Sequence, residues 1–506
     1  MRIAGMVLVA GLVPAVLSAQ GPAAGAGPGA PAPRTPLRLT MAEAVSRALQ
    51  AGDEIRIARA QVRQARGQVT QAWASALPEI RWSLTYQRTL ASSFRAQMAG
   101  AGTGGPSFDP DTTQSLADRV KYLEDHLLDG SAAMSGLGRL FAHLPFGPPN
   151  TYIATLTFSQ TLFQGGKVGA GIRGAHAYER AAQATLDDTQ QDLAYRVKLA
   201  YLGALFAQRM LDISEATQVQ VNEHLRAVTV NHRVGSTGDY DLLRSQVESA
   251  NQEPAVLAAR NNLETSQLEL KRLINAPVDQ PLELTTAVLA EADSLPEVDT
   301  VALEAEVPER SSITAADANV EFRRQAVRVY RGDLYPSLKF TMSYGGTAYP
   351  SGVFPSYGQF KRDWIATVSL SMPLFDGFRT HGQVGQARAE LMRAEAQASQ
   401  AREGVAIQVA QARSEMQRAR VLVAARRQTV AQAARAYHLA DVRYANGIAS
   451  SIEVSDARLA LQQARVNEAQ SMRDYLVAMA GLERALGRPV PLARPAQRVA
   501  EGGAGQ

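Results

Sequence analysis

The sequence has no cysteine among its 506 residues. This absence excludes disulfide bonds, thiol nucleophiles, cysteine-ligated zinc and iron–sulfur clusters. It also excludes a lipid anchor on an N-terminal Cys, so we expect any membrane attachment to come from the folded chain itself.

Aromatic residues and unbalanced charge are also scarce. Aromatics make up 6% of the chain, and 52 Lys and Arg face 48 Asp and Glu, for a net charge of +4. The sequence has no block of clustered Lys and Arg residues of the kind that binds nucleic acid, so we predict no nucleic-acid partner. The motifs H-E-x-x-H and G-x-S-x-G are missing too, and we expect His224 and His232 to be helix-surface residues. We therefore predict no enzyme, no cofactor and no metal site.

Only the N-terminus carries a long apolar run, MRIAGMVLVAGLVPAVLSAQ. One Arg, an apolar stretch and then small residues predict a secretory signal peptide at 1–19, followed by a flexible Pro, Gly and Ala linker at 20–36. No later apolar run reaches 18 residues, so the exported chain has no predicted transmembrane helix.

The remaining chain contains an internal duplication. The segment YIATLTFSQTLFQGG, which starts at Tyr152, aligns with WIATVSLSMPLFDGF, which starts at Trp364, so the offset is 364 − 152 = 212. The same offset pairs Gly235 with Gly447 without a gap. The segment ALPEIRWSLTY, which starts at Ala76, aligns with LYPSLKFTMSY, which starts at Leu334. Pro78 then matches Pro336, so the second offset is 336 − 78 = 258. The two halves therefore share one plan.

We predict two structural repeats, each with a helix, two strands and a helical hairpin. The first repeat carries extra residues between its strands, rich in Gly, Pro, Ser and Asp, which we interpret as a large surface loop. The predicted divisions are a first repeat at 37–277 with its loop at 91–150, a linker at 278–297, a second repeat at 298–490 and a disordered tail at 491–506.

Four segments alternate between apolar and polar residues, as β-strands do. They lie at about 80–90, 151–163, 338–346 and 363–374. A soluble antiparallel sheet with one wet face would show the same alternation. Export, a length near that of a membrane-spanning strand, and aromatics at the strand ends favour a membrane barrel. Four strands cannot close alone, so two chains would supply eight strands and three would supply twelve.

Long helical hairpins follow each second strand, at 166–274 and 378–487. The first helix of each contains no Pro and spans roughly 100 Å at 1.5 Å per residue. Small apolar residues recur every three or four positions, which indicates close packing of many helices. A coiled-coil scaffold would give a similar pattern.

A G-x-G-x-x-G sequence formed by Gly169, Gly171 and Gly174 starts the first long helix. A dinucleotide site needs a short helix and a second strand after this turn, and the helix here continues for dozens of residues. We instead predict strand-to-helix junctions at Gly165, Gly166 and Gly377, where glycine permits the backbone conformation that the turn requires.

The sequence resembles the TolC-like family of outer-membrane efflux and secretion ducts. The resemblance covers about 37–490 and is carried by SQTLFQGGK and SMPLFDGFR at the junctions and by RYANGIASSIEVSDARLALQQAR at the second hairpin. It implies a mainly α protein with membrane β: a homotrimer whose twelve-stranded outer-membrane β-barrel continues into a periplasmic α-helical barrel. It also implies an exit duct for efflux or type I secretion. The implied partners are outer-membrane lipid, a periplasmic adaptor and an inner-membrane transporter of the RND, ABC or MFS type.

The resemblance further implies roles at the periplasmic tip. Gly235 and Gly447 would form the hairpin turns that meet the adaptor. Glu453 and Asp456 would form carboxylate rings at a narrow aperture, although exposed helix acids are usually only solvated. Tyr444 and Asp241 match positions in the polar network that closes the tip, whereas Ala449 stands where the family has an Arg. The rival interpretation is a soluble periplasmic coiled-coil scaffold.

Overall fold

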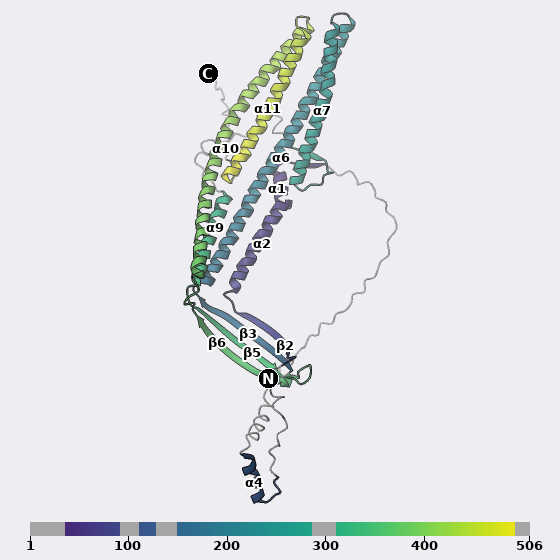
Figure 1. Cartoon of the computed structure of the whole chain (residues 1–506). Helices are drawn as coiled ribbons and strands as arrows, with labels where there is room; N and C mark the ends of the chain where they lie inside the picture. The colour runs from purple at the N-terminus through teal and green to yellow at the C-terminus, as the bar shows by residue number, and fades with distance from the viewer. Residues whose placement is uncertain (1–35, 92–110, 128–148, 286–309, 491–506) are drawn as a thin grey trace, which may run out of the picture.

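The computed structural model describes residues 36–91, 111–127, 149–285 and 310–490. The predicted signal peptide, the C-terminal tail and most of the three intervening linker and loop segments lie outside these residues. The described chain is mostly helical, with a sheet at one end and two hairpin tips at the other (Figure 1).

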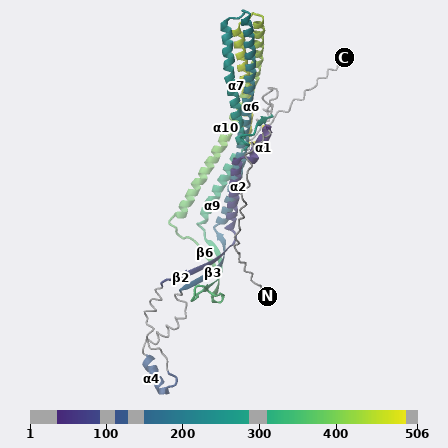
Figure 2. The same ribbon diagram turned by 90° about the vertical axis from the view of Figure 1, so that its right-hand side faces the viewer.

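Four helices form the two hairpins. The first pairs α6 (Lys167–Arg233) with α7 (Asp239–Leu273), and the second pairs α10 (Arg379–Ala445) with α11 (Ser451–Leu486). Both α6 and α10 contain 67 residues, as expected from their shared repeat. Figure 2 shows all four helices gathered closely at the tip.

Three shorter helices flank the long ones. They are α1 (Met41–Ala51), α2 (Asp53–Ala74) and α9 (Ser311–Gly332). Helix α2 packs against α6, and α9 packs against both α6 and α10. A capping box fixes the start of α1, because Thr40 and Glu43 satisfy each other's backbone N–H groups.

A four-stranded antiparallel sheet has the order β2-β3-β5-β6. Its strands are β2 (Glu79–Arg88), β3 (Asn150–Gln164), β5 (Ser337–Ala348) and β6 (Lys361–Ser371). All four expected strands are present. The last one ends three residues before the expected 374, because Pro373 has no N–H to donate to a ladder. Every residue of the two edge strands, β2 and β6, is exposed.

A second, two-stranded sheet was not anticipated. Strands β1 (Leu37–Leu39) and β4 (Leu282–Leu284) pair in parallel, and β4 follows shortly after the end of α7. The chain also forms α4 (Leu116–Leu127) inside the long first loop. Among the described residues, no helix is both long and apolar enough to cross a membrane.

The main hydrophobic core lies where the two-stranded sheet meets the helices. Tyr201 of α6 is fully buried there, and its hydroxyl donates to the Leu39 carbonyl at 2.9 Å. Ile55, Leu270 and Leu482 bring α2, α7 and α11 into the same cluster. This core fixes the ends of α7 and α11 that lie far from the hairpin tips.

Candidate functional site: the hairpin tips

Both tip turns have the same backbone geometry. Gly235 and Gly447 adopt φ values of 79° and 71°, in the left-handed region that favours glycine. After α10, the Gly447 N–H donates to the Tyr444 carbonyl and the Ile448 N–H to the Arg443 carbonyl, both at 2.9 Å. These two bonds define a Schellman motif, which satisfies the last carbonyls of the helix. The first tip repeats the motif around Gly235.

The two predicted aperture acids have different environments. Glu453 lies across the turn from Arg443, whose Nη1 donates to Glu453 Oε1 at 2.9 Å. Asp456 lies one turn further along α11 and is exposed, and it forms no ion pair within the described part of the chain. Sequence reasoning missed Arg443, which places a guanidinium near the tip where Ala449 provides none.

Tyr444 and Asp241 are not joined to each other. The Tyr444 ring lies 5.4 Å from the His224 ring, and its hydroxyl is buried without a hydrogen-bond partner among the described residues. Asp241 is half-buried at the start of α7 and makes no hydrogen bond or ion pair in this part of the chain. A direct link between them is therefore not part of this single-chain arrangement.

The expectation that His224 is a surface residue is wrong. Its side chain points between the hairpins, only 9% of the residue is exposed, and Nε2 lies 3.2 Å from Ser451 Oγ on α11. Burial lowers the pKa of His224, and the nearby charge of Arg458 lowers it further. A sequence signal was available, because His224 shares a heptad-like spacing with buried Val221 and Val228.

An ion pair joins the two hairpins about two helical turns further from the tip than the contact between His224 and Ser451. Arg458 of α11 pairs with Glu248 of α7, and the Arg458 side chain is 8% exposed. Ser455 Oγ donates to Glu248 Oε2 at 3.2 Å, and Arg244 adds a longer contact at 3.5 Å. Burial alone would raise the pKa of Glu248, but its bonds to Arg458 and Ser455 lower it overall. The carboxylate is thus held ionised between the two hairpins.

The strand-to-helix junctions require unusual backbone angles. Gly165, Gly166 and Gly377 have φ values of 54°, 76° and 66°. A Cβ on Gly165 would lie 2.3 Å from the Gly332 carbonyl oxygen, so only glycine fits this contact. Phe378 occupies the repeat-matched position of Gly166 and adopts a φ of 64° despite its side chain.

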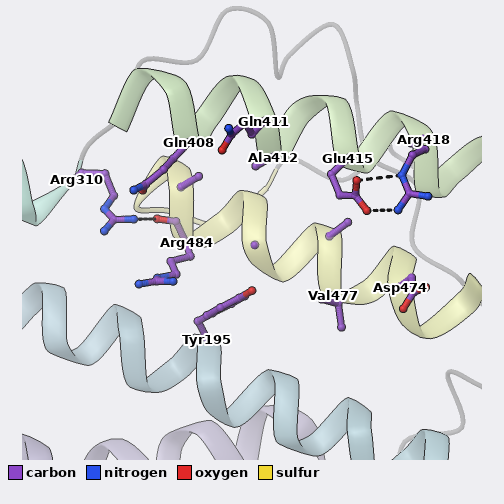
Figure 3. Close-up of a pocket in the computed structure, with 13 residues that line it drawn as sticks. Tyr195, Arg310, Gln408, Gln411, Ala412, Glu415, Arg418, Asp474, Val477 and Arg484 are labelled. Atoms are coloured by element: carbon purple, nitrogen blue, oxygen red, sulfur yellow. Dashed lines mark hydrogen bonds and ion pairs between the residues drawn. The ribbon is translucent and has the colours of Figure 1, made fainter. Parts of the chain in front are cut away.

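A groove of about 640 Å³ lies at mid-height between α10 and α11 (Figure 3). Two of its charged groups already have partners: Glu415 pairs with Arg418, and Arg310 Nη1 donates to the backbone carbonyl of Arg484 at 2.7 Å. A smaller groove lies at the repeat-matched height between α6 and α7. We interpret both as packing gaps within the hairpins. The described residues also contain no group of His, Asp or Glu that could hold a metal ion.

The family model described as outer membrane efflux protein matches residues 133–276 and 302–488. The chain belongs to the outer membrane efflux protein family. Members of this family are channel proteins rather than enzymes, which confirms the expectation that the chain has no catalytic role.

Known relatives of this efflux protein are divergent in sequence. The alkaline protease secretion protein AprF of Pseudomonas aeruginosa is 26% identical over 344 residues, which span 66% of this chain and 69% of AprF. The outer membrane protein TolC of Salmonella enteritidis is 24% identical over 347 residues, or 67% of this chain and 69% of TolC. The crystal structure of the outer membrane protein VceC of Vibrio cholerae has a TM-score of 0.67 at 19% identity, covering 89% and 96% of the two chains. The fold is therefore shared, and the resemblance to the TolC-like family is confirmed.

Proposed function

We propose that this chain assembles as a homotrimer into an outer-membrane exit duct for efflux or type I secretion. Family membership supports the duct. The observation that carries the assembly is that faces on the second repeat are exposed, although the matched faces on the first repeat are buried. The number of three chains comes from the strands, as argued below.

Helix α6 packs against α9, which belongs to the other repeat. On α6, Ala177 is fully buried, whereas its match 212 residues later, Ala389 on α10, is exposed. The repeat-matched partner for that α10 face is α2, and α2 packs on α6 instead. An α2 from a second chain would cover the exposed α10 face.

Residue sizes support this contact. Gly174 on α6 faces Gln325 on α9, and a Cβ on Gly174 would lie 3.4 Å from the Gln325 Cβ. The matched positions are Gln386 on α10 and Gly67 on α2, and both are exposed. The small and large residues are exchanged between the two helices, so the pair fits a close contact between neighbouring chains equally well.

The strands support the same assembly. Strand β3 pairs with β5 across the repeats, whereas the matched pair, β6 with β2, consists of the two unpaired edges of the sheet. Open edges in lipid would leave backbone groups unpaired at several kcal/mol each. Three chains of four strands would close a twelve-stranded barrel with a lumen.

The hairpins would extend the barrel into the periplasm. With α6 and α10 of 67 residues each, the helices reach roughly 100 Å from the sheet. In this arrangement the turns at Gly235 and Gly447 would meet a periplasmic adaptor, which couples the duct to an energised inner-membrane transporter of the RND, ABC or MFS type. The names of AprF and TolC place such relatives in secretion and at the outer membrane.

The aperture at the tip would be ringed by carboxylates. We assign the dominant ring to Asp456, which is exposed and unpaired within the described residues. Glu453 would form a weaker ring because Arg443 neutralises it. Tyr444 and Asp241 would line the closed tip, where Tyr444 acts through packing against His224. Three unpaired Asp456 carboxylates would favour cations over anions.

Detergent extraction and planar-bilayer recording test this proposal against a soluble scaffold. A duct requires detergent, migrates as a trimer and gives discrete cation-preferring openings. Asp456→Asn should lower the cation preference, whereas Glu453→Gln, a matched loss of one carboxylate, should change it less. Protein that stays soluble without detergent and gives no channel openings in the bilayer would support the soluble scaffold.

A further inference from the structure

We propose that the α4 helices of three chains pack into a parallel three-helix bundle that covers the outer mouth of the duct. The inference rests on the proposed trimer. It concerns α4 (Leu116–Leu127), the helix inside the long loop between β2 and β3, for which the duct itself requires no role.

The topology places α4 at the outer end of the sheet. Strand β2 follows α2 and strand β3 leads into α6, so the long helices lie at one end of the sheet. The loop that carries α4 leaves β2 after Arg88 and returns to β3 at Asn150, at the opposite end. Figure 1 shows α4 beyond that end, far from the hairpin tips. In the proposed trimer, three copies of α4 would therefore surround the outer mouth of one lumen.

Helix α4 has a defined start but needs a packing partner. Ser115 precedes it, and the Ser115 carbonyl accepts from the N–H groups of Asp118 and Arg119, both at 3.1 Å. The Ser115 hydroxyl also accepts from the Asp118 N–H at 3.4 Å, as an N-cap residue does. A helix of 12 residues is only marginally stable in water by itself. Burial of its apolar face would stabilise it.

The apolar face of α4 has the spacing of a coiled coil. Leu116, Val120, Leu123 and Leu127 are four, three and four residues apart, as successive d and a positions of a heptad are. We call these four positions the seam. In the single chain, Leu116 is 77% exposed and Val120 is 46% exposed. The seam is thus largely uncovered, and a second copy of the same seam is the partner that its spacing fits.

The charges beside the seam fit a parallel neighbour. In this heptad Arg119 occupies position g and Glu124 occupies position e. In a parallel coiled coil, a g residue faces the e residue of the following heptad on the next helix, five positions on, and 124 − 119 = 5. Each contact between chains would then join Arg119 to the Glu124 of a neighbour. An antiparallel pair would bring like charges together instead.

The symmetry of a trimer also requires the parallel arrangement. A threefold axis rotates one helix onto the next without reversing it, and the lumen lies on that axis. Three copies of α4 that touch one another must therefore lie around the axis of the lumen. The connections to the strands contain 116 − 88 − 1 = 27 and 150 − 127 − 1 = 22 residues. Each can span roughly 70 Å or more, which is enough to reach the axis.

A membrane surface fits α4 less well. Amphipathic helices that lie on membranes carry mainly Lys and Arg on their polar face. On α4, Arg119 and Lys121 are outnumbered by Asp118, Glu124 and Asp125. The charge therefore favours a second copy of α4 over anionic lipid. Assembly into one trimer also raises the effective concentration of the three helices, so a short seam is sufficient.

Cysteine cross-linking can test the bundle, because the chain has no cysteine of its own. Leu123→Cys places one thiol in the seam of each chain, and Asp125→Cys places one on the exposed outer face of the same helix as a matched control. Each purified trimer is treated with a short bismaleimide and run on a denaturing gel. We expect dimer bands severalfold stronger for Leu123→Cys than for Asp125→Cys. Val120→Cys is a second seam variant, in case the loss of Leu123 unfolds the helix.

A charge swap tests the register. Adding Arg119→Glu to Leu123→Cys should weaken the dimer band severalfold, because it sets two carboxylates against each other at every contact between chains. Adding Glu124→Arg as well should restore the band, since the exchanged pair can form again between neighbours. Residues 119 and 124 lie on opposite sides of the seam of one helix, so the swap rebuilds no pair within a chain. A band that the double swap fails to restore would contradict the parallel register.

Native gels of the same preparations report the trimer separately. A trimer in which neither seam variant gives more dimer than Asp125→Cys would overturn the bundle, whether α4 then lies on its own chain or on lipid. A preparation without trimers would contradict the proposed assembly itself, and the bundle with it.

Discussion

Arg443 and Glu453 face each other across the second tip turn, with Nη1 and Oε1 2.9 Å apart. They lie on α10 and α11 of the same hairpin, so the pair closes the hairpin on itself and does not join it to another. Both side chains are about two-fifths exposed, at 43% and 41%. The contribution of such a pair to stability is small, about 0–1 kcal/mol, and its main effect is on local charge.

Arg443→Gln should increase the cation preference of the pore, because it frees Glu453 to act beside Asp456. Stability should change by less than about 1 kcal/mol. Reversal potentials in a salt gradient measure the effect. Arg420→Gln, which removes an exposed Arg further down the same helix, is the matched control. An equal shift in both variants would contradict the assignment.

Acidification should loosen the tip through His224. The pKa of this residue is lowered below the ordinary value of 6.5 by burial and by Arg458, against opposing contributions from Glu248, Asp441 and Asp241. The unfolded state therefore binds more protons, so stability rises with pH and falls as pH drops below about 6.5. Hydrogen exchange of the tip amides should become severalfold faster at acid pH in the wild type. His224→Gln should lose most of this dependence, and a dependence unchanged in that variant would refute the prediction.

Glu468→Gln should stabilise the protein at neutral and alkaline pH. Burial raises the pKa of this α11 carboxyl, although Arg209, Arg427 and Arg465 oppose the shift. The folded state therefore binds more protons than the unfolded state, so this group's contribution is lost as pH rises through its folded pKa. Thermal melts should show the largest gain, roughly a few degrees, at high pH and little gain at low pH. Glu264→Gln, on the neighbouring hairpin, is the exposed control.

Gly165→Ala should destabilise each chain by about 2–4 kcal/mol, since it combines a left-handed φ with a Cβ clash against Gly332. Gly377→Ala is its repeat match and has nothing within 4 Å in one chain. There we expect only about 1–2 kcal/mol from the backbone, plus a defect in trimer assembly. Urea unfolding and native gels separate the two effects. Equal loss of chain stability in both variants would argue against this difference.

Tyr444→Phe should leave the resting leak of the duct unchanged. The Tyr444 hydroxyl is buried without a partner among the described residues, so removing it breaks no bond there. Tyr444→Ala should raise the leak, because it removes the ring that packs against His224. Uptake of a large antibiotic compares the variants. A leak in the Phe variant would place the hydroxyl's partner on a neighbouring chain.

Features governed by local pattern could be predicted. Alternation along β2 and β6 identified strands, and the absence of Pro along α6 and α10 indicated unbroken helices, because each signal lies within the segment that it describes. Gly235 and Gly447 marked the tip turns for the same reason, since a left-handed backbone position favours glycine wherever it occurs.

The partners of individual side chains could not be predicted in the same way. His224 was misjudged, and the bonds from Arg443 to Glu453 and from Arg458 to Glu248 were missed. Each depends on how two separate helices are turned toward each other. Turning one helix by a single residue position, about 100°, would point such a side chain away from its partner on the other helix.

The sequence by itself determined the duplicated plan, the strands, the long helices and the family, because all of these are written in local periodicity and motif order. Only the tertiary structure decided which polar side chains join the two hairpins and which acidic residue near the tip has no ion-pair partner among the described residues. Hydrophobic periodicity selects the face that a helix buries, whereas the pairing of polar groups across that face is set by the relative height and rotation of the packed helices.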